Sequence, residues 1–292
     1  MSDSGGLPQK AELDAVPFYP QEEYQCGPAA LAMVLEAGGK PIKPEDLRPQ
    51  VFLPDRHGSL QIEMLAAARR NGFVAVELNP KLSDLLAEVA AGNPAVVLQN
   101  LALDWYPVWH YAVAVGYDLK EERIVLRSGT ERRLEMPLST FERTWQRGGY
   151  WAMLALPPGR IPASVAAADY VGAVTKLEKA GSPESAQAAY KGALARWPDQ
   201  LTALIGLGNT SYRVGDFEGA EHAFRRATVV YPNSAAAHNN LAQTLADLDR
   251  YDEALNEARV AVGLGGPLVD TSTRTLDAIV SHTGRGEQEW NK

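Results

Sequence analysis

The sequence predicts an α+β domain followed by an all-α domain built from helical repeats. In the first half, helical apolar patterns come early and strand-like apolar runs come late, an order typical of α+β domains. In the second half, small residues recur with a spacing of 34 residues, which indicates stacked helix pairs. The proline-rich stretch 156–165 separates these two patterns, so we expect the domain boundary there.

The helices expected in the first half show apolar residues at helical spacing and recognisable ends. Residues 28–39 have Pro28 in the first turn and Gly38 near the end, positions that these residues favour in helices. The segment 59–72 places four apolar residues on one face and ends at a glycine. Helical structure is therefore predicted over 28–39, 44–50, 59–72 and 81–92.

The later part of the first half is dominated by short apolar runs rich in valine, leucine and isoleucine. Such runs are typical of buried strands when polar turn residues bound them. Strands are expected over 73–78, 95–101, 111–117, 123–128 and 151–156.

Charge and hydropathy exclude several classes of function. The 28 basic and 36 acidic side chains give a net charge of −8 without a basic stripe, so we expect no nucleic-acid partner. No apolar run is long enough to span a bilayer, and the first ten residues do not resemble a signal peptide. We therefore expect a cytoplasmic chain with a flexible leader over residues 1–13. A periplasmic or lipid-anchored location is the alternative if an export signal was removed.

The repeats of the second half resemble tetratricopeptide repeats (TPRs). Ala186, Ala220 and Ala254 keep the same frame, and so do Pro198 and Pro232. Small residues at fixed places let two helices approach closely, and neighbouring pairs must stack to bury their apolar faces. We predict three repeats, over 167–200, 201–234 and 235–266, after a linker at 158–166. A capping helix over 271–280 and a tail occupy residues 267–292.

The single cysteine lies at the start of a predicted helix. Cys26 precedes Gly27 and Pro28, where the helix dipole stabilises a negative charge. We therefore expect a lowered pKa and a nucleophilic thiol. A buried structural cysteine is the alternative.

A histidine and a serine are expected to face each other across a hairpin. His110 begins one predicted strand and Ser128 ends the next, and the polar segment 118–122 joins them. A turn centred near residue 119 places the two residues directly opposite each other, so Ser128 would orient the imidazole.

These residues carry a resemblance to the papain-like bacteriocin-processing peptidases, which remove double-glycine leader peptides. The strings QEEYQCGPAALAMVL (21–35) and WHYAVAVGYD (109–118) are similar to the family's motifs, and the resemblance extends over 14–157. It implies a papain-like fold in which Cys26 is the nucleophile and His110 acts as general base and then acid. Gln21 would then donate to the oxyanion.

Ser128 departs from this family, which usually has an aspartate after the second strand. A serine accepts the imidazole N–H but adds no negative charge to stabilise an imidazolium. Asp104 and Glu131 are weaker candidates for the missing carboxylate.

The sequence therefore predicts a thiol peptidase whose repeats recruit a protein partner, and whose substrate is an extended peptide or leader. The alternative is a weak or inactive peptidase-like domain that acts as a peptide-binding adaptor. The sequence has neither a phosphate-binding loop nor metal-ligand spacing, so no cofactor or metal is expected.

Overall fold

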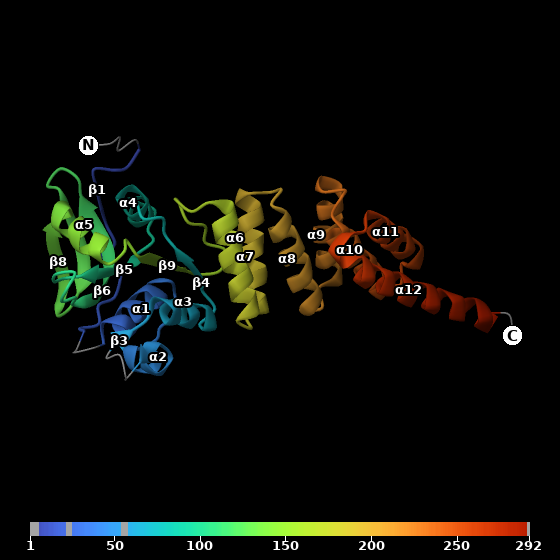
Figure 1. Cartoon of the computed structure of the whole chain (residues 1–292), viewed down its shortest axis with the longest axis horizontal. Coiled ribbons are helices and arrows are strands. Elements are labelled where there is room, and N and C mark those ends of the chain that lie inside the picture. Colours follow the sequence, from blue (N-terminus) through green and yellow to red (C-terminus); the bar gives the residue numbers. More distant parts are fainter. Residues whose placement is uncertain (1–5, 22–24, 54–57, 291–292) are drawn as a thin grey trace. The chain divides into compact units, whose positions relative to one another are not determined.

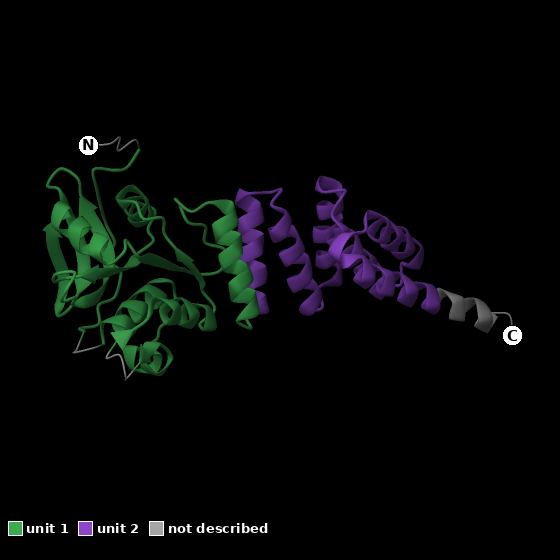
Figure 2. Cartoon of the chain, in the orientation of Figure 1, with its two compact units in different colours: residues 1–182 green, residues 183–292 purple. Residues whose placement is uncertain are grey.

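The computed structural model describes residues 6–21, 25–53 and 58–290, the last eight of these as backbone only. The chain divides into two compact units, residues 1–182 and 183–292 (Figure 2). The first unit contains the sheet and its helices, and the second is helical (Figure 1).

The first unit is built on a seven-stranded antiparallel sheet. Its main path has the order β4-β9-β5-β6-β7-β8, and β1 pairs with β6 beyond the end of β5. The strands are β1 (Lys10–Glu12), β4 (Val74–Glu77), β5 (Ala95–Asn100), β6 (Trp109–Asp118), β7 (Arg123–Ser128), β8 (Glu131–Pro137) and β9 (Ala152–Leu156). A separate short pair joins β2 (Phe52–Leu53) to β3 (Gly58–Ser59).

Helix α1 (Cys26–Ala37) lies at the centre of this unit's core. Every residue from Gly27 to Leu35 is buried, so the helix is apolar on all sides rather than amphipathic. Gly27 allows a close approach to β3, because a Cβ there would lie 2.3 Å from Oγ of Ser59. The remaining helices of the unit are α2 (Pro44–Val51), α3 (Gln61–Arg70), α4 (Leu82–Ala90), α5 (Leu138–Arg147) and α6 (Ala167–Lys179).

The segment after β9 is held against the first unit by side-chain hydrogen bonds. Arg160 donates to the carbonyls of Ala91 and Gly92, and buried Glu88 accepts from the main chain and hydroxyl of Ser164. Tyr170 of α6 donates to the carbonyl of Arg160. Helix α6 also packs on β4 and α3, so it clusters with the first unit.

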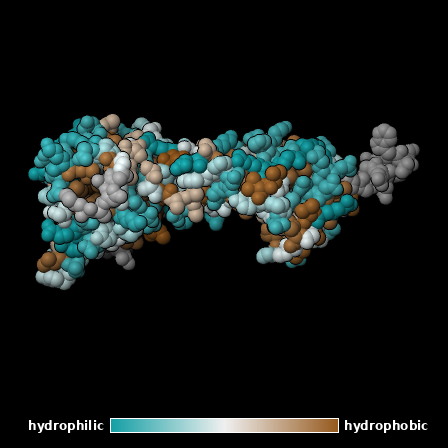
Figure 3. All heavy atoms as spheres, turned by 90° about the horizontal axis from the view of Figure 1, so that it is seen from above, coloured by the Kyte–Doolittle hydropathy of each residue, from teal (hydrophilic) through white to brown (hydrophobic). Residues whose placement is uncertain are grey.

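The second unit consists of helix pairs that pack through small residues. Gly206 and Gly208 of α8 lie against the rings of Tyr190 and Phe224, each with 2.3 Å between the ideal Cβ and the nearest ring atom. Asp216 caps α9 by accepting from the N–H of Gly219. The elements are α7 (Pro183–Arg196), α8 (Leu201–Arg213), α9 (Phe217–Val230), α10 (Ala235–Asp247), α11 (Tyr251–Leu264), the short η2 (Gly266–Leu268) and α12 (Val269–Trp290). The face of the molecule in Figure 3 is mainly hydrophilic, with scattered apolar patches.

Besides the short pair β2–β3 and η2, the sequence did not predict β1, β8 and α5. Strand β1 lies within the segment expected to be a flexible leader, where Lys10, Ala11 and Glu12 pair with β6. Strand β8 and helix α5 follow β7, and both are rich in charged residues. They form because each has one face against the fold: Phe141, Thr144 and Trp145 are buried on α5.

Candidate functional site

Cys26 is the first residue of α1 and lies beside the main chain of β6. Burial raises the pKa of its thiol, and this effect outweighs the hydrogen bonds from the backbone N–H groups of Tyr111, Gly27 and Cys26 itself, which lower it. The expected lowering of the pKa is therefore wrong in its net direction. The helix N-terminus does act on the sulfur, but the core that surrounds α1 removes water from it.

His110 contacts Ser128, although the register differs from the one expected. Nε2 of the imidazole lies 2.8 Å from Oγ of Ser128. The strands pair with Val113 opposite Arg127, so Ser128 lies diagonal to His110 rather than directly opposite. The difference arises at the turn, because Asp118 pairs with Arg123 and the turn is therefore centred between residues 120 and 121. The register shift between Ala114 and Gly116 takes back only one residue of this offset.

The imidazole has a largely buried, uncharged environment. Burial lowers the pKa of His110, so at neutral pH the ring is a neutral base. Asp104 and Glu131, considered as substitutes for a carboxylate, are both exposed. Among the described residues, the hydrogen-bond partner of the ring is Ser128.

The side chain of Gln21 is fixed by hydrogen bonds at both ends. Nε2 donates to the carbonyl of Tyr111 at 3.1 Å, and Oε1 accepts from the N–H of Gly129 at 2.9 Å. The main-chain N–H of Gln21 donates to the carbonyl of Gly129. Nε2 carries a second hydrogen that can serve another acceptor. The sequence neighbours of Gln21 at 22–24 lie outside the described residues.

Tyr111 connects the candidate residues, and sequence reasoning missed it. Its N–H acts on the sulfur of Cys26, its carbonyl accepts from Gln21, and its hydroxyl donates to the carbonyl of Ser59. Its position directly after His110 is the signal that could have found it. The structure therefore brings Cys26, His110, Gln21 and Ser128 to the first residues of β6.

Arg127 holds the segment that leads to Gln21. The residue is only 2% exposed, and its guanidinium donates to the carbonyls of Arg132, Asp14 and Val16. Two consecutive residues of β7 thus serve different purposes: Arg127 fixes the N-terminal segment, while Ser128 contacts the imidazole.

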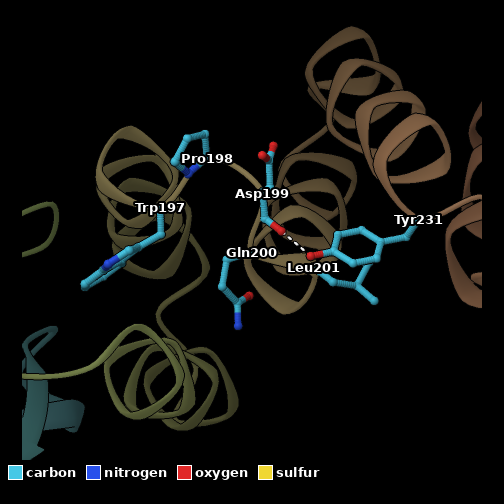
Figure 4. Close-up of a pocket in the computed structure, with 6 residues that line it drawn as sticks. All are labelled: Trp197, Pro198, Asp199, Gln200, Leu201 and Tyr231. Carbon is cyan, nitrogen blue, oxygen red and sulfur yellow. Dashed lines mark hydrogen bonds between the residues drawn. The ribbon is translucent and has the colours of Figure 1, made fainter.

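Two surface hollows lie away from these residues. One, of about 360 Å³, is lined by charged groups that include the paired Lys10 and Asp118. The other, of about 450 Å³, lies at the turn between α7 and α8 (Figure 4). There Tyr231 donates to the carbonyl of Asp199, while the indole of Trp197 points away from them. Neither hollow presents a nucleophile beside a base.

Within the described ranges, no group of histidine, cysteine and carboxylate side chains is arranged to hold a metal ion. The helices of the same ranges include none with both the length and the apolar character needed to cross a bilayer.

Comparisons with known proteins match the two halves of the chain to two different families. The Peptidase_C39 like family matches residues 13–153, and the tetratricopeptide repeat matches residues 172–213 and 205–267. Protein FlbA of Caulobacter vibrioides is 31% identical over 107 residues, which are 37% of this chain and only 18% of FlbA. The chain therefore spans less than a fifth of that relative's length.

Two solved structures are each similar to part of the chain. A C39-like peptidase from Bacillus anthracis is 21% identical with a TM-score of 0.43, covering 51% of this chain and 98% of its own. The type III secretion translocator chaperone SycD of Yersinia enterocolitica is 18% identical with a TM-score of 0.37, covering 39% of this chain and 90% of its own. The family matches show that the chain consists of a domain of the Peptidase_C39 like family followed by tetratricopeptide repeats.

Proposed function

We propose that the chain is a thiol peptidase that cleaves a bond in an extended peptide, and that its repeats recruit a protein partner. The observation that carries this proposal is the convergence of Cys26, His110 and Gln21 on the main chain around Tyr111. A nucleophile, a base and an amide donor are the groups that acyl transfer needs.

The proposed reaction begins from a neutral thiol and a neutral imidazole, as the directions of both pKa shifts favour. Because Nε2 of His110 is engaged with Ser128, Nδ1 would take the proton as the sulfur of Cys26 attacks the carbonyl carbon. The oxyanion would accept hydrogen bonds from the second Nε2 hydrogen of the Gln21 side chain and from the main-chain N–H of Cys26. The imidazolium would then protonate the leaving amine, and water would release the acyl group.

A specific observation favours a second candidate, a peptide-binding adaptor. The partner of the imidazole is the uncharged Ser128, and burial disfavours the thiolate. Both features lower the reactivity of the pair, although a peptide could still bind beside it. Removal of bacteriocin-type leader peptides is a more specific version of the first candidate, the peptidase.

A peptide library distinguishes the two candidates. The full-length protein is incubated with a tryptic digest of a cell lysate, and new peptide termini are identified by mass spectrometry. A peptidase produces termini that disappear in both Cys26→Ala and His110→Ala. An adaptor leaves the library uncut but retains the same peptides in the parent and in Cys26→Ala, and that result would contradict the peptidase proposal.

We predict that Ser128→Asp raises the rate of peptide cleavage by about tenfold or more, because a carboxylate stabilises the imidazolium that forms during attack. Ser128→Ala should lower the rate, because it removes the acceptor that orients the ring. The measurement is kcat/KM for a peptide identified in the library. Equal rates in all three proteins would show that residue 128 does not act through His110.

A further inference from the structure

The loop between β5 and β6 exposes an unusual concentration of apolar side chains. Of the fourteen large hydrophobic residues that are exposed in the described parts of the chain, six lie in residues 101–109, here called the aromatic hairpin. Trp105 is 80% exposed and Tyr106 is 68% exposed. The six residues are Leu101, Leu103, Trp105, Tyr106, Val108 and Trp109.

This hairpin is ordered by a buried asparagine rather than by an apolar core. Asn100 is 1% exposed, and its Oδ1 accepts from the N–H groups of Ala102 at 3.1 Å and Val108 at 3.0 Å. The main chain of Leu101 also donates to the carbonyl of Val108. The backbone is therefore fixed while the aromatic rings point into solvent.

Fixed, exposed aromatic rings are suited to binding. They provide a large contact area, and little conformational freedom is lost when a ligand covers them. Apolar clusters of this kind at a protein surface mark interaction sites, and tryptophan and tyrosine contribute most to such contacts.

The position of the hairpin relates it to the proposed site. His110 pairs with Gln99, and Trp109 pairs with Asn100, so the hairpin continues directly from the candidate base. Trp105 precedes His110 by five residues, so the tip lies at most about 16 Å from His110, the length that five fully extended residues would span. An extended peptide covers the same distance in about five residues.

We propose that the aromatic hairpin is the apolar wall of the peptide-binding groove and selects peptides with large apolar side chains within about five residues of the bond at Cys26. This inference rests on the proposed function, since it assigns a substrate class to that site. The charge pattern favours a peptide over an anionic bilayer: the hairpin contains one acidic residue, Asp104, and no basic residue, in a chain of net charge −8.

The test measures binding separately from cleavage. The full-length protein with Cys26→Ala is titrated against two fluorescein-labelled 12-residue peptides, and polarisation gives each Kd. One peptide contains glycine, alanine and serine with two leucines and a phenylalanine, and the other has serine at those three positions. The test variant adds Trp105→Ser and Tyr106→Ser. The matched control adds Val229→Ser, which removes a side chain that is 75% exposed on α9.

The apolar peptide should bind about tenfold more tightly than the serine peptide, and this preference should fall below about threefold in the hairpin variant. The Val229→Ser control should keep the preference. An equal preference in the hairpin variant and the control, or none in the parent, would overturn the proposal. Sedimentation with phosphatidylserine vesicles tests the membrane alternative. The proposal is also overturned if the hairpin variant keeps its peptide preference and loses only its binding to these vesicles.

Cleavage by the protein with intact Cys26 separates this proposal from the peptidase function. If the protein binds the apolar peptide selectively but cleaves neither peptide, the binding role of the hairpin is supported and the peptidase proposal is contradicted. Cleavage of both peptides with equal kcat/KM supports the peptidase and overturns the docking role.

Discussion

At Cys26, two physical effects act on the thiol in opposite directions. The N–H groups at the start of α1 and of Tyr111 favour the thiolate, while burial against the core favours the neutral thiol. The sequence shows the first effect, because Cys26 visibly precedes a helix. It does not show the second, because burial of this residue depends on packing by distant segments, among them β6.

We predict that iodoacetamide labels Cys26 slowly at pH 7 and that the rate rises through and above pH 9. The thiolate is the reactive form, and burial raises the pKa of Cys26 above its ordinary value, so the thiol is mostly protonated at neutral pH. Cys26 is the sole cysteine, so intact mass reports its labelling directly. A rate plateau at pH 5–7 that disappears in His110→Ala would contradict this, because it would reveal a thiolate–imidazolium pair.

At the scale of elements, the hairpin β6–β7 shows what sequence patterns can and cannot define. The two apolar runs predicted both strands, and β7 has the expected bounds of 123–128. The register was wrong because Asp118 pairs with Arg123, which centres the turn between residues 120 and 121 rather than near 119. Apolar alternation does not reveal where the turn lies within a polar segment. The contact of His110 with Ser128 survives because long side chains also meet across a diagonal.

Strand β8 and helix α5 were missed for a related reason. The segment 131–147 carries many charges and lacks a continuous apolar run. Its burial is concentrated in a few residues, such as Phe141 and Trp145, whose rings stack with 5.6 Å between their centroids. Sequence patterns therefore identify elements whose faces are broadly apolar more readily than edge elements anchored by a few large side chains.

The helical repeats allow a sharper prediction, because their small residues are contact points. Gly208→Ala should destabilise the second unit by about 1–3 kcal/mol, since the new Cβ would lie 2.3 Å from the ring of Phe224. Gly263→Ala is the matched control: it lies in α11 with open space around it and should stabilise by about 0.5 kcal/mol through helix propensity. Urea unfolding followed by circular dichroism measures both. Equal changes would show that the contact with Phe224 does not limit packing.

At the scale of the whole molecule, the repeat pattern and the packing divide the chain at different places. The sequence places the first helix pair entirely within the repeats, beginning at residue 167. By its contacts, α6 clusters instead with the first unit, whose last residue is Ser182. The repeat spacing indicates that α6 has a repeat-like sequence. The compact unit to which α6 belongs depends instead on the surfaces that its apolar side chains contact.

This assignment predicts that α6 stabilises the peptidase-like unit. A fragment of residues 1–182 keeps the packing of α6 on β4 and the bond from Tyr170 to the carbonyl of Arg160, and a fragment of residues 1–166 loses both. The shorter fragment should therefore unfold with a free energy lower by about 2 kcal/mol, because apolar surface on β4 becomes exposed and the carbonyl loses its donor. Urea unfolding of the two fragments measures the difference. Coincident unfolding curves would show that α6 contributes only as part of the repeats, and the natural boundary would then lie before residue 167.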